Sequence, residues 1–366
     1  MFVVGARPQF VKSAPVIHEL LRRSGVELQL VHSGQHYDYE LSRLFFEELE
    51  LPPPLLDLRV GSGSHAVQTG RAMIRLERCM LASKPDMVIV PGDTNTTLAA
   101  ALAAAKLNLR LAHLEAGARS FDMSMPEEVN RKVADHLSRL LFAPTETAAG
   151  NLSREGIPGE RIRLTGDTMV DALKRSLPAA LKNQDALLSK FNLERRGYVT
   201  VTAHRPGNVD DPYNLRSMVE ALVEASGRVK VVFPVHPRTM ERLRSFHLLG
   251  ELKRCRNMIL TRPLGYLEFT ALLDAAAMTL TDSGGVQKEA YLLGVPCATM
   301  RRETEWPETL MDDANVLVGS DKAGILNAVS RILEEGKPRT RRVYSTSPFG
   351  DGEASKRIAD ITLEMA

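Results

Sequence analysis

The sequence predicts an α/β protein with two Rossmann-like parallel-sheet domains. Short runs of Val, Ile and Leu alternate along the chain with amphipathic helical stretches, which is the pattern of βαβ units. The chain has 366 residues, and at roughly 150 residues per domain this length suits two domains. Residues 3–8 and 201–206 repeat one pattern, a strand followed by a small residue and Arg-Pro. Each is predicted to open one Rossmann-like half.

The predicted elements follow from hydrophobic periodicity and turn residues. Strands are predicted at residues 26–31, 87–90, 109–114, 198–202, 229–234 and 278–281. Helices are predicted between them, with apolar faces formed by Phe10, Val11, Ala14, Ile17, Leu20 and Leu21, by Met73, Ile74, Leu76, Met80 and Leu81, and by residues 98–105. Ligands of such sheets lie at the carboxyl ends of the strands, so the residues just after each strand are the candidates for a site.

The boundary between the domains is predicted in residues 170–196, a polar helical stretch that contains Pro178. We therefore expect an N-terminal domain of residues 1–170 and a C-terminal domain of residues 171–345. A helical run follows two glycines near the end of the chain, and we expect residues 346–366 to pack back on the N-terminal domain.

Composition argues against several classes of protein. Lys and Arg number 47 against 45 Asp and Glu, so the formal charge of +2 offers little attraction to nucleic acid or an anionic membrane. Cys79, Cys255 and Cys297 are far apart and odd in number, which argues against a disulfide framework and fits a reducing compartment. We see no membrane-length apolar run and no signal peptide, and we expect a cytoplasmic protein without nucleic-acid or membrane partners.

Three carboxylates, Asp93, Glu115 and Glu127, follow predicted strands of the N-terminal half or open the next helix. Together at one sheet edge they would suit proton transfer. Each also has a structural explanation. Asp93 or Thr94 can cap a helix, and Glu115 can pair with Arg119. Glu127 lies in a helical first turn, where the helix dipole favours acids.

Cations follow other predicted strands. Arg7 and Lys12 lie at the start of the first predicted helix, where amides and cations both attract a phosphate. His204 and Arg205 follow the first strand of the second half, and His236 follows its second strand. These positions predict an anion bound between the domains, although a single histidine is more often structural.

A glycine turn in the second half predicts a nucleotide diphosphate. Ser283, Gly284 and Gly285 follow a strand and open a helix, so that free amides can bind an anion. Glu289 lies about one turn further on and could accept hydrogen bonds from ribose hydroxyls. The sequence has no P-loop, no G-x-G-x-x-G after a strand and no convincing zinc spacing. We therefore expect no cofactor and no metal site.

Several short motifs occur in order along nearly the whole chain. They are Gly5-Ala6-Arg7-Pro8-Gln9 with Lys12, Gly34-Gln35-His36, Gly92-Asp93-Thr94, His113-Leu114-Glu115-Ala116-Gly117, Pro126-Glu127-Glu128 with Asn130-Arg131, Pro144-Thr145-Glu146, His204-Arg205, Asp282-Ser283-Gly284-Gly285 with Glu289, and Thr304-Glu305 with Pro307-Glu308. Together they resemble the non-hydrolysing UDP-N-acetylglucosamine 2-epimerases. The resemblance implies a GT-B-like fold, two domains facing a central cleft that holds the active site, and a homodimer.

The resemblance also implies a reaction, the reversible interconversion of UDP-GlcNAc and UDP-ManNAc. A base takes the proton from C2 while UDP leaves C1, and UDP adds back to the 2-acetamidoglucal after reprotonation on the other face. By the family pattern Asp93, Glu115 and Glu127 are the acid and base candidates, and His204 stabilises or protonates the leaving diphosphate. Substrate contacts are implied for Arg7, Lys12, Gln35, His36, Arg205, His236, Phe269, Ser283, Gly284, Gly285, Glu289 and Trp306.

Departures from the family pattern keep alternatives open. The family commonly has Arg where this chain has Trp306, and Leu264 replaces a Gln. Relatives that act on UDP-2,3-diacetamido-2,3-dideoxy-glucuronic acid also have this Trp, so that sugar is the first alternative substrate. A GT-B glycosyltransferase or an inactive nucleotide-sugar sensor is the second alternative, but neither needs the three carboxylates. Gln35, Arg205 and His236 match part of an activator site of some bacterial members, which leaves UDP-GlcNAc activation open.

Overall fold

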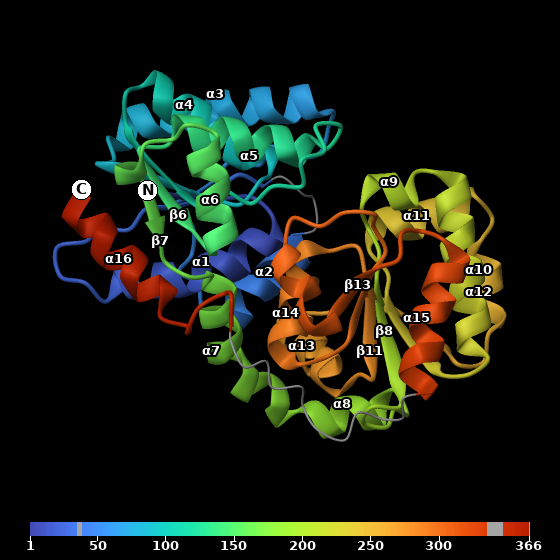
Figure 1. The fold of residues 1–366 in the computed structure, drawn as a ribbon. Helices are drawn as coiled ribbons and strands as arrows, with labels where there is room; N and C mark the ends of the chain where they lie inside the picture. The colour runs from blue at the N-terminus through green and yellow to red at the C-terminus, as the bar shows by residue number, and fades with distance from the viewer. Residues whose placement is uncertain (35–38, 335–346, 366) are drawn as a thin grey trace. The chain divides into compact units, whose positions relative to one another are not determined.

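The computed structural model of the chain describes residues 1–34, 39–334 and 347–365 (Figure 1). The chain forms two compact units. Unit 1 comprises Met1–Arg175 and Ser347–Ala366, and unit 2 comprises Ser176–Thr346. The change from unit 1 to unit 2 falls inside helix α7 (Thr168–Lys182), within the polar stretch expected to hold the boundary.

Unit 1 contains a sheet of seven parallel strands in the order β3-β2-β1-β4-β5-β6-β7. The strands are β1 (Phe2–Val4), β2 (Leu30–His32), β3 (Leu56–Asp57), β4 (Met87–Pro91), β5 (Arg110–Leu114), β6 (Leu140–Ala143) and β7 (Ile162–Leu164). The chain starts in the middle of the sheet, builds one side and then crosses to build the other. This is the doubly wound order, in which ligands bind beyond the carboxyl ends of the strands near the crossover from β1 to β4.

The helices of unit 1 cover the sheet. They are α1 (Arg7–Leu21), α2 (Tyr39–Glu48), α3 (His65–Ser83), α4 (Asn95–Lys106), α5 (Pro126–Leu137), α6 (Glu146–Arg154) and α16 (Ala354–Met365). Helices α3, α4 and α5 pack in series, and α1 packs against α2 and α16 (Figure 1). Helix α4 is rich in buried alanines such as Ala99, Ala100 and Ala104, whose small side chains allow close packing.

Unit 2 repeats the plan with six parallel strands in the order β10-β9-β8-β11-β12-β13. The strands are β8 (Tyr198–Thr202), β9 (Lys230–Pro234), β10 (Met258–Thr261), β11 (Met278–Thr281), β12 (Cys297–Thr299) and β13 (Asn315–Leu317). Its helices are α8 (Gln184–Lys190), α9 (Pro206–Val209), α10 (Pro212–Ser226), α11 (Pro237–Ser245), α12 (Leu249–Arg254), α13 (Tyr266–Ala275), α14 (Gly284–Leu293) and α15 (Lys322–Glu334). Strand β8 has the place in this sheet that β1 has in unit 1, so the repeated Arg-Pro pattern does mark equivalent strands.

The expected two-sheet α/β class is confirmed, and the main difference lies in β2. A strand is predicted from residue 26, whereas β2 begins at Leu30. The preceding residues are partly or fully exposed, and β1 pairs with β2 only from Phe2 and Leu30 onward, so the chain before Leu30 has no strand to pair with. Among the described residues no helix is long and apolar enough to cross a membrane.

Candidate active site

The carboxyl ends of β4 and β5 bring two of the predicted carboxylates to one edge of the unit 1 sheet. Pro91 pairs with Leu114 as the last residues of the two strands, so Asp93 and Glu115 follow neighbouring strand ends. The carbonyl oxygen of Leu114 accepts a hydrogen bond from the Gly92 amide at 3.0 Å. This hydrogen bond fixes the backbone next to both Asp93 and Glu115.

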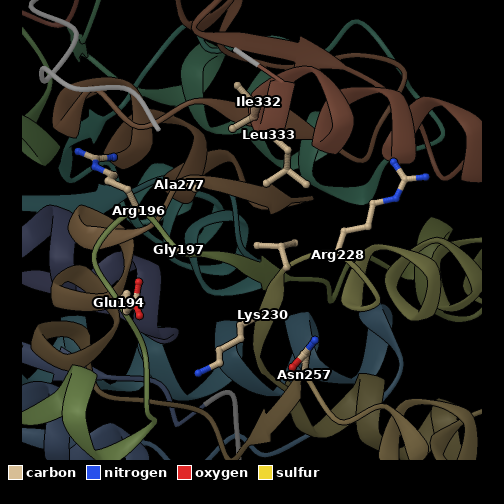
Figure 2. A pocket seen from close by; sticks show the side chains of 10 residues that line it. Glu194, Arg196, Gly197, Arg228, Lys230, Asn257, Ala277, Ile332 and Leu333 are labelled. Carbon is tan, nitrogen blue, oxygen red and sulfur yellow. The ribbon is translucent and has the colours of Figure 1, made fainter. Parts of the chain in front are cut away.

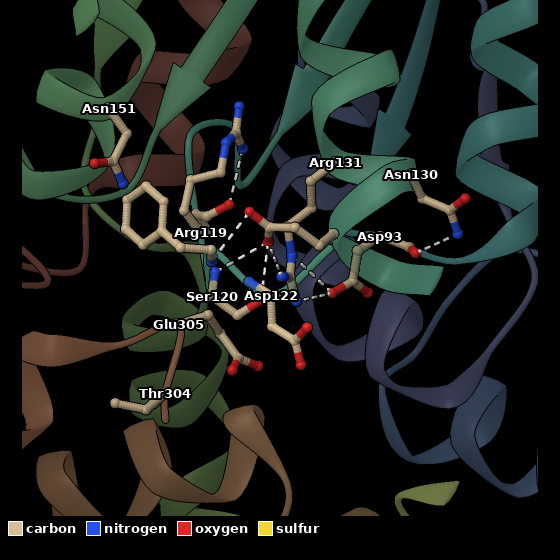
Figure 3. Close-up of polar contacts among 12 residues, drawn as sticks. Asp93, Arg119, Ser120, Asp122, Asn130, Arg131, Asn151, Thr304 and Glu305 are labelled. Carbon is tan, nitrogen blue, oxygen red and sulfur yellow. Dashed lines mark hydrogen bonds and ion pairs between the residues drawn. The ribbon is translucent and has the colours of Figure 1, made fainter. Parts of the chain in front are cut away.

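Asp93 binds Arg131 rather than capping the next helix. Arg131 donates to Asp93 Oδ2 from Nη2 at 2.6 Å and from Nε at 3.1 Å, and Asn130 donates to the Asp93 carbonyl at 2.9 Å (Figure 3). The cap of α4 is Thr94, whose side chain accepts from the Thr97 amide. The Asp93 side chain is 23% exposed, so it is held in place by a cation and still reaches solvent.

Glu115 comes directly after β5 and forms an ion pair with Lys12 of α1. Its φ of +67° lies in the left-handed region, which costs a non-glycine residue free energy. The suggested pairing of Glu115 with Arg119 is wrong. Arg119 instead binds Asp135 at 2.7 Å and Glu155 at 2.7 Å.

Glu127 is half-buried in the first turn of α5, where Pro126 begins the helix. Its neighbour Glu128 is fully buried and has a structural task. It accepts hydrogen bonds from the Ser120 amide at 2.9 Å and from Arg131 Nη1 at 2.8 Å (Figure 3). Glu128 therefore orders the loop before α5, and the adjacent Glu127 side chain remains the third acid at this edge.

The cations expected at the start of α1 make different contacts. Arg7 is the first residue of α1, and its guanidinium carbon lies 5.7 Å from the centre of the Phe45 ring. Lys12, one turn further on, makes the ion pair with Glu115 described above. Gln35 and His36, which the resemblance places at the substrate, lie outside the described residues.

His204 follows β8 in unit 2, and the buried carboxylate of Asp282 contacts both its imidazole ring and its backbone amide. Asp282, after the neighbouring strand β11, lies 3.1 Å from His204 Nδ1 and accepts from the backbone amides of His204 and Arg205. Burial alone would raise the pKa of Asp282, but His204 and these hydrogen bonds lower it to about 2. Asp282 is thus a carboxylate that orients the imidazole, with Nε2 turned away from it.

Arg205 and His236 complete this strand edge. Arg205 Nη2 lies 3.5 Å from Glu305, which also binds Arg301 at 2.6 Å. His236 follows β9 and caps α11, because its Nδ1 accepts from the Arg238 amide at 3.2 Å. The rings of His204 and His236 are 5.5 Å apart, so the predicted histidine pair is present in unit 2.

Helix α14 begins at the glycine turn for which an anion cradle is predicted. Ser283 is the N-cap residue, but its side chain makes no capping bond, and Gly284 and Gly285 begin the helix. Glu289 is buried one turn later. The burial of Tyr266 and the nearby carboxylate of Glu289 together raise the pKa of Tyr266. Phe269 is half-buried on α13, the helix that precedes β11.

Trp306 lies beneath this cradle. Its side chain is buried, and its indole Nε1 would stand 3.0 Å from a Cβ placed on Gly284. The ammonium of Lys288, itself buried, lies 3.7 Å from the centre of the Trp306 ring. The cation–π contact compensates part of the cost of burying that charge. Trp306 therefore shapes the cradle from below.

A pocket of about 450 Å³ lies at the other edge of the unit 2 sheet (Figure 2). Gly197, Asn257 and Ala277, which line it, each immediately precede a strand. Two lining cations already donate to backbone carbonyls, Arg196 to Ala276 at 2.7 Å and Lys230 to Asn192. Ligands of parallel sheets bind at the carboxyl ends of strands, so this pocket is not the candidate site.

Three functional features were missed from the sequence. Asp282 belongs to one of the short sequence motifs and directly follows strand β11, so its position after a strand could have identified it as a site residue. Lys288 reads as a surface lysine on α14, and only the fold shows that it is buried against Trp306. The partners of His113 in β5 could not be inferred, because they come from other elements.

Comparison with known proteins decides the family. A family model described as UDP-N-acetylglucosamine 2-epimerase matches residues 18–363. The chain belongs to this family. A UDP-N-acetylglucosamine 2-epimerase homolog of Methanococcus maripaludis is 46% identical over 363 residues, which are 99% of each chain.

Two further relatives of this UDP-N-acetylglucosamine 2-epimerase family member are named for different nucleotide sugars. The UDP-2,3-diacetamido-2,3-dideoxy-D-glucuronate 2-epimerase of Pseudomonas aeruginosa is 41% identical over 371 residues, 99% of each chain. The crystal structure of the Methanocaldococcus jannaschii UDP-GlcNAc 2-epimerase in complex with UDP-GlcNAc and UDP is 43% identical, with a TM-score of 0.92 and 99% of each chain covered.

Proposed function

We propose that this protein interconverts UDP-GlcNAc and UDP-ManNAc by elimination and re-addition of UDP. A carboxylate takes the C2 proton, the electrons of that bond form the C1–C2 double bond, and the C1–O bond breaks as UDP leaves. Proton return to the other face of C2 and attack of UDP at C1 complete the epimerisation. The observation that carries the proposal is the placement of Asp93 and Glu115 at neighbouring strand ends, in a family of 2-epimerases.

The acid and base roles fall to the three carboxylates of unit 1. Inversion at C2 needs proton transfer on both faces of the sugar, so at least two groups are required. Asp93 is held by Arg131 and Glu115 by Lys12, and these contacts fix the position of each carboxylate. Glu127 is the third candidate, because it lies half-buried at the start of α5.

Groups of unit 2 bind and stabilise the departing diphosphate. Anions bind at helix N-termini through free amides and the helix dipole, and α14 begins with two glycines that allow close approach. Asp282 engages Nδ1 of His204, which leaves Nε2 to donate to a phosphate oxygen as negative charge develops there. Arg205 supplies further positive charge, Phe269 contacts the uracil, and Glu289 accepts hydrogen bonds from the ribose. Arg7, the first residue of α1, is the proposed phosphate contact of unit 1.

One NMR experiment tests this reaction. The protein is incubated with UDP-GlcNAc in deuterated water, with EDTA and without added NAD. We expect UDP-ManNAc to form and deuterium to appear at C2, because a carboxylate base exchanges its proton with solvent. Retention of the original hydrogen through many turnovers, or loss of activity that added metal restores, would refute this mechanism. The absence of UDP-ManNAc would favour a transferase or a sensor.

A second candidate substrate is UDP-2,3-diacetamido-2,3-dideoxy-glucuronic acid. The relative of 41% identity from Pseudomonas aeruginosa favours it, as does Trp306, which this chain has in place of the family's common Arg. Its C2 bears the same hydrogen and the same acetamido group, so the same carboxylates would serve. Comparing kcat/KM for the two nucleotide sugars under identical conditions decides which one the protein prefers.

We also propose a homodimer. Helix α3 supports it with a stripe of exposed apolar residues at intervals of seven: Val67, Ile74 and Leu81 are 43%, 51% and 57% exposed. Residues seven apart share one helix face, and a two-fold axis would let two such stripes pack on each other. Sedimentation should give a dimer for the parent and a monomer for Ile74→Glu combined with Leu81→Glu. A dimer in both would place the interface elsewhere.

Finally, we propose a cytoplasmic location, where nucleotide sugars and reduced thiols coexist. All three cysteines are free, and burial raises the pKa of Cys297 to about 12, which suppresses its reactive thiolate. Cell fractionation with thiol labelling tests this proposal. Recovery of the protein with an extracellular or membrane fraction would contradict it.

A further inference from the structure

A buried ionic contact lies behind the two acidic side chains of unit 1. His113 of β5 and Asp135 of α5 are both fully buried. His113 Nδ1 lies 2.6 Å from Asp135 Oδ1, and Nε2 lies 2.7 Å from the carbonyl oxygen of Gly92. Both ring nitrogens of His113 are therefore engaged, Nδ1 by the carboxylate of Asp135 and Nε2 by the backbone of the loop after β4.

The second carboxylate oxygen of Asp135 extends the network. Oδ2 accepts from the Gly117 amide at 3.1 Å and lies 2.7 Å from Arg119 Nη2. Arg119 also donates to both oxygens of Glu155, at 2.7 and 2.8 Å. Burial would raise the pKa of Asp135, but His113 and Arg119 outweigh it and lower that pKa. Asp135 thus contacts both His113 and Arg119, which offsets the cost of burying its charge.

The network holds two loops at defined points. Gly92 directly precedes Asp93, and Gly117 comes two residues after Glu115. Both glycines have a positive φ, +65° and +82°. A Cβ on Gly117 would stand 2.2 Å from the carbonyl oxygen of Ala148, so this turn fits closely against α6. The network and the close fit leave each loop little freedom.

We propose that His113 and Asp135 are positioning residues that fix the carboxylates of Asp93 and Glu115 for proton transfer at the sugar. The role rests on the proposed 2-epimerase function. The His113 side chain bonds the loop after β4, and the Asp135 side chain bonds the loop after β5. The contact between these two side chains therefore sets the separation of the two acids that the loops carry. A displacement of about 1 Å at reacting groups can lower a rate by about 10²-fold.

Two isosteric variants of His113 separate its two hydrogen bonds. In His113→Asn the amide can stand where Nδ1 stood and keep the bond to Asp135, while the bond to Gly92 is lost. In His113→Gln the amide can replace Nε2 and keep the bond to Gly92. We expect His113→Asn to lower kcat roughly 10- to 100-fold, with KM and UDP affinity within about twofold of the parent. We expect His113→Gln to retain more of kcat than His113→Asn.

A matched control removes an ionic partner that contacts neither His113 nor the turns at Gly92 and Gly117. Glu155→Gln breaks the outer end of the same network, where the side chain is 20% exposed. We expect its kcat to stay within about twofold of the parent. Amide hydrogen exchange in β4 and β5 is measured for every variant at the assay temperature. Full protection together with a lower kcat in His113→Asn supports positioning.

Three results would overturn the proposal. One is a kcat within twofold of the parent in His113→Asn and in His113→Ala. Another is a fall in kcat that only parallels lost protection in β4 and β5, which is the signature of partial unfolding. A parent protein that exchanges no C2 hydrogen refutes the proposed function, and the positioning role with it. The parent assay distinguishes that last case from the other two.

Discussion

His204 has one ring nitrogen committed to Asp282, which leaves the other for a substrate oxygen. The carboxylate is fully buried and also accepts from the amides of His204 and Arg205, so it cannot turn toward a ligand. Such a carboxylate fixes the tautomer and the direction of the imidazole. The ring of His204 is then oriented so that Nε2 can donate to a diphosphate.

The variant Asp282→Asn tests this orientation. The amide oxygen can still accept from the backbone, but the neutral amide no longer offers a charged acceptor to Nδ1 of His204, so we expect kcat to fall about 10- to 100-fold. Steady-state kcat of the variant and of the parent under the same conditions measures this effect. Asp211→Asn, at the exposed cap of α10, is the control and should match the parent.

The three carboxylates of unit 1 give the strongest expected effects on turnover. Asp93→Asn, Glu115→Gln and Glu127→Gln should each lower kcat by about 10²-fold or more, the usual scale for a general acid or base. Glu146→Gln, in the exposed first turn of α6, should leave kcat within about twofold. A full rate in any of the three would remove that residue from the proton-transfer steps.

The places of these acids could be predicted from the sequence, but their partners could not. Asp93 and Glu115 were found because residues after buried strands gather at one edge. Lys12 is 103 positions from Glu115, and only the β1–α1 connection brings it there. Arg119 was the nearest cation in sequence, yet Asp135 and Glu155 bind it, because the turn at Gly117 directs the chain toward α5 and α6.

Helix α14 is the element whose first turn is proposed to bind the nucleotide. Its two glycines differ in what surrounds them. A Cβ on Gly284 would stand 2.3 Å from Glu305 Oε1, whereas a Cβ on Gly285 would meet only Ser283 Oγ at 3.9 Å. The first glycine therefore permits packing, and the second leaves room on the outer side of the turn.

Alanine at each glycine should separate packing from binding. Gly284→Ala must displace Glu305 or Trp306, so we expect unit 2 to lose stability, by about 1–3 kcal/mol. Gly285→Ala should melt like the parent but bind UDP at least about tenfold more weakly, because its methyl group occupies the approach to the amides. Calorimetry of unfolding and of UDP binding measures both. Equal UDP affinity in Gly285→Ala and the parent would mean that the nucleotide does not use this turn.

Helices and strands with a strong hydrophobic pattern could be predicted from the sequence, and short ones could not. Strands β8 and β11 have the predicted bounds, because each is a run of apolar and β-branched residues between turns. Strands such as β3, with two exposed residues, carry too little pattern to be recognised. Helix α4 begins three residues before the apolar run, because Thr94 caps it and the intervening residues are polar.

Across the whole molecule, buried carboxylates tie stability to pH. The pKa of Asp282 is lowered to about 2, below its value in an unfolded chain of about 3.9. The stability from this shift is fully present above about pH 5 and is lost as pH falls toward 2. The pKa of Asp135 is also lowered, so both units carry such a group.

Urea unfolding at several pH values should show this dependence. We expect the free energy of unfolding of the parent to exceed that of Asp282→Asn most near pH 6, by about 2–3 kcal/mol. The difference should shrink steadily below pH 4, as the carboxyl becomes protonated. A difference that stays constant between pH 6 and pH 3 would show that Asp282 does not titrate as a buried ion-paired carboxylate.

The left-handed backbone at Glu115 has a consequence for selection experiments. A glycine or asparagine adopts a φ of +67° at a lower cost in free energy than a glutamate does. Either replacement of Glu115 would therefore relieve backbone strain while removing the acid. A library screened only for heat resistance should therefore enrich such replacements, and the survivors should be dead enzymes. A library screened for turnover should retain glutamate at this position. Sequencing both pools after a few rounds would measure how much robustness the protein gives up at this one residue to remain a catalyst.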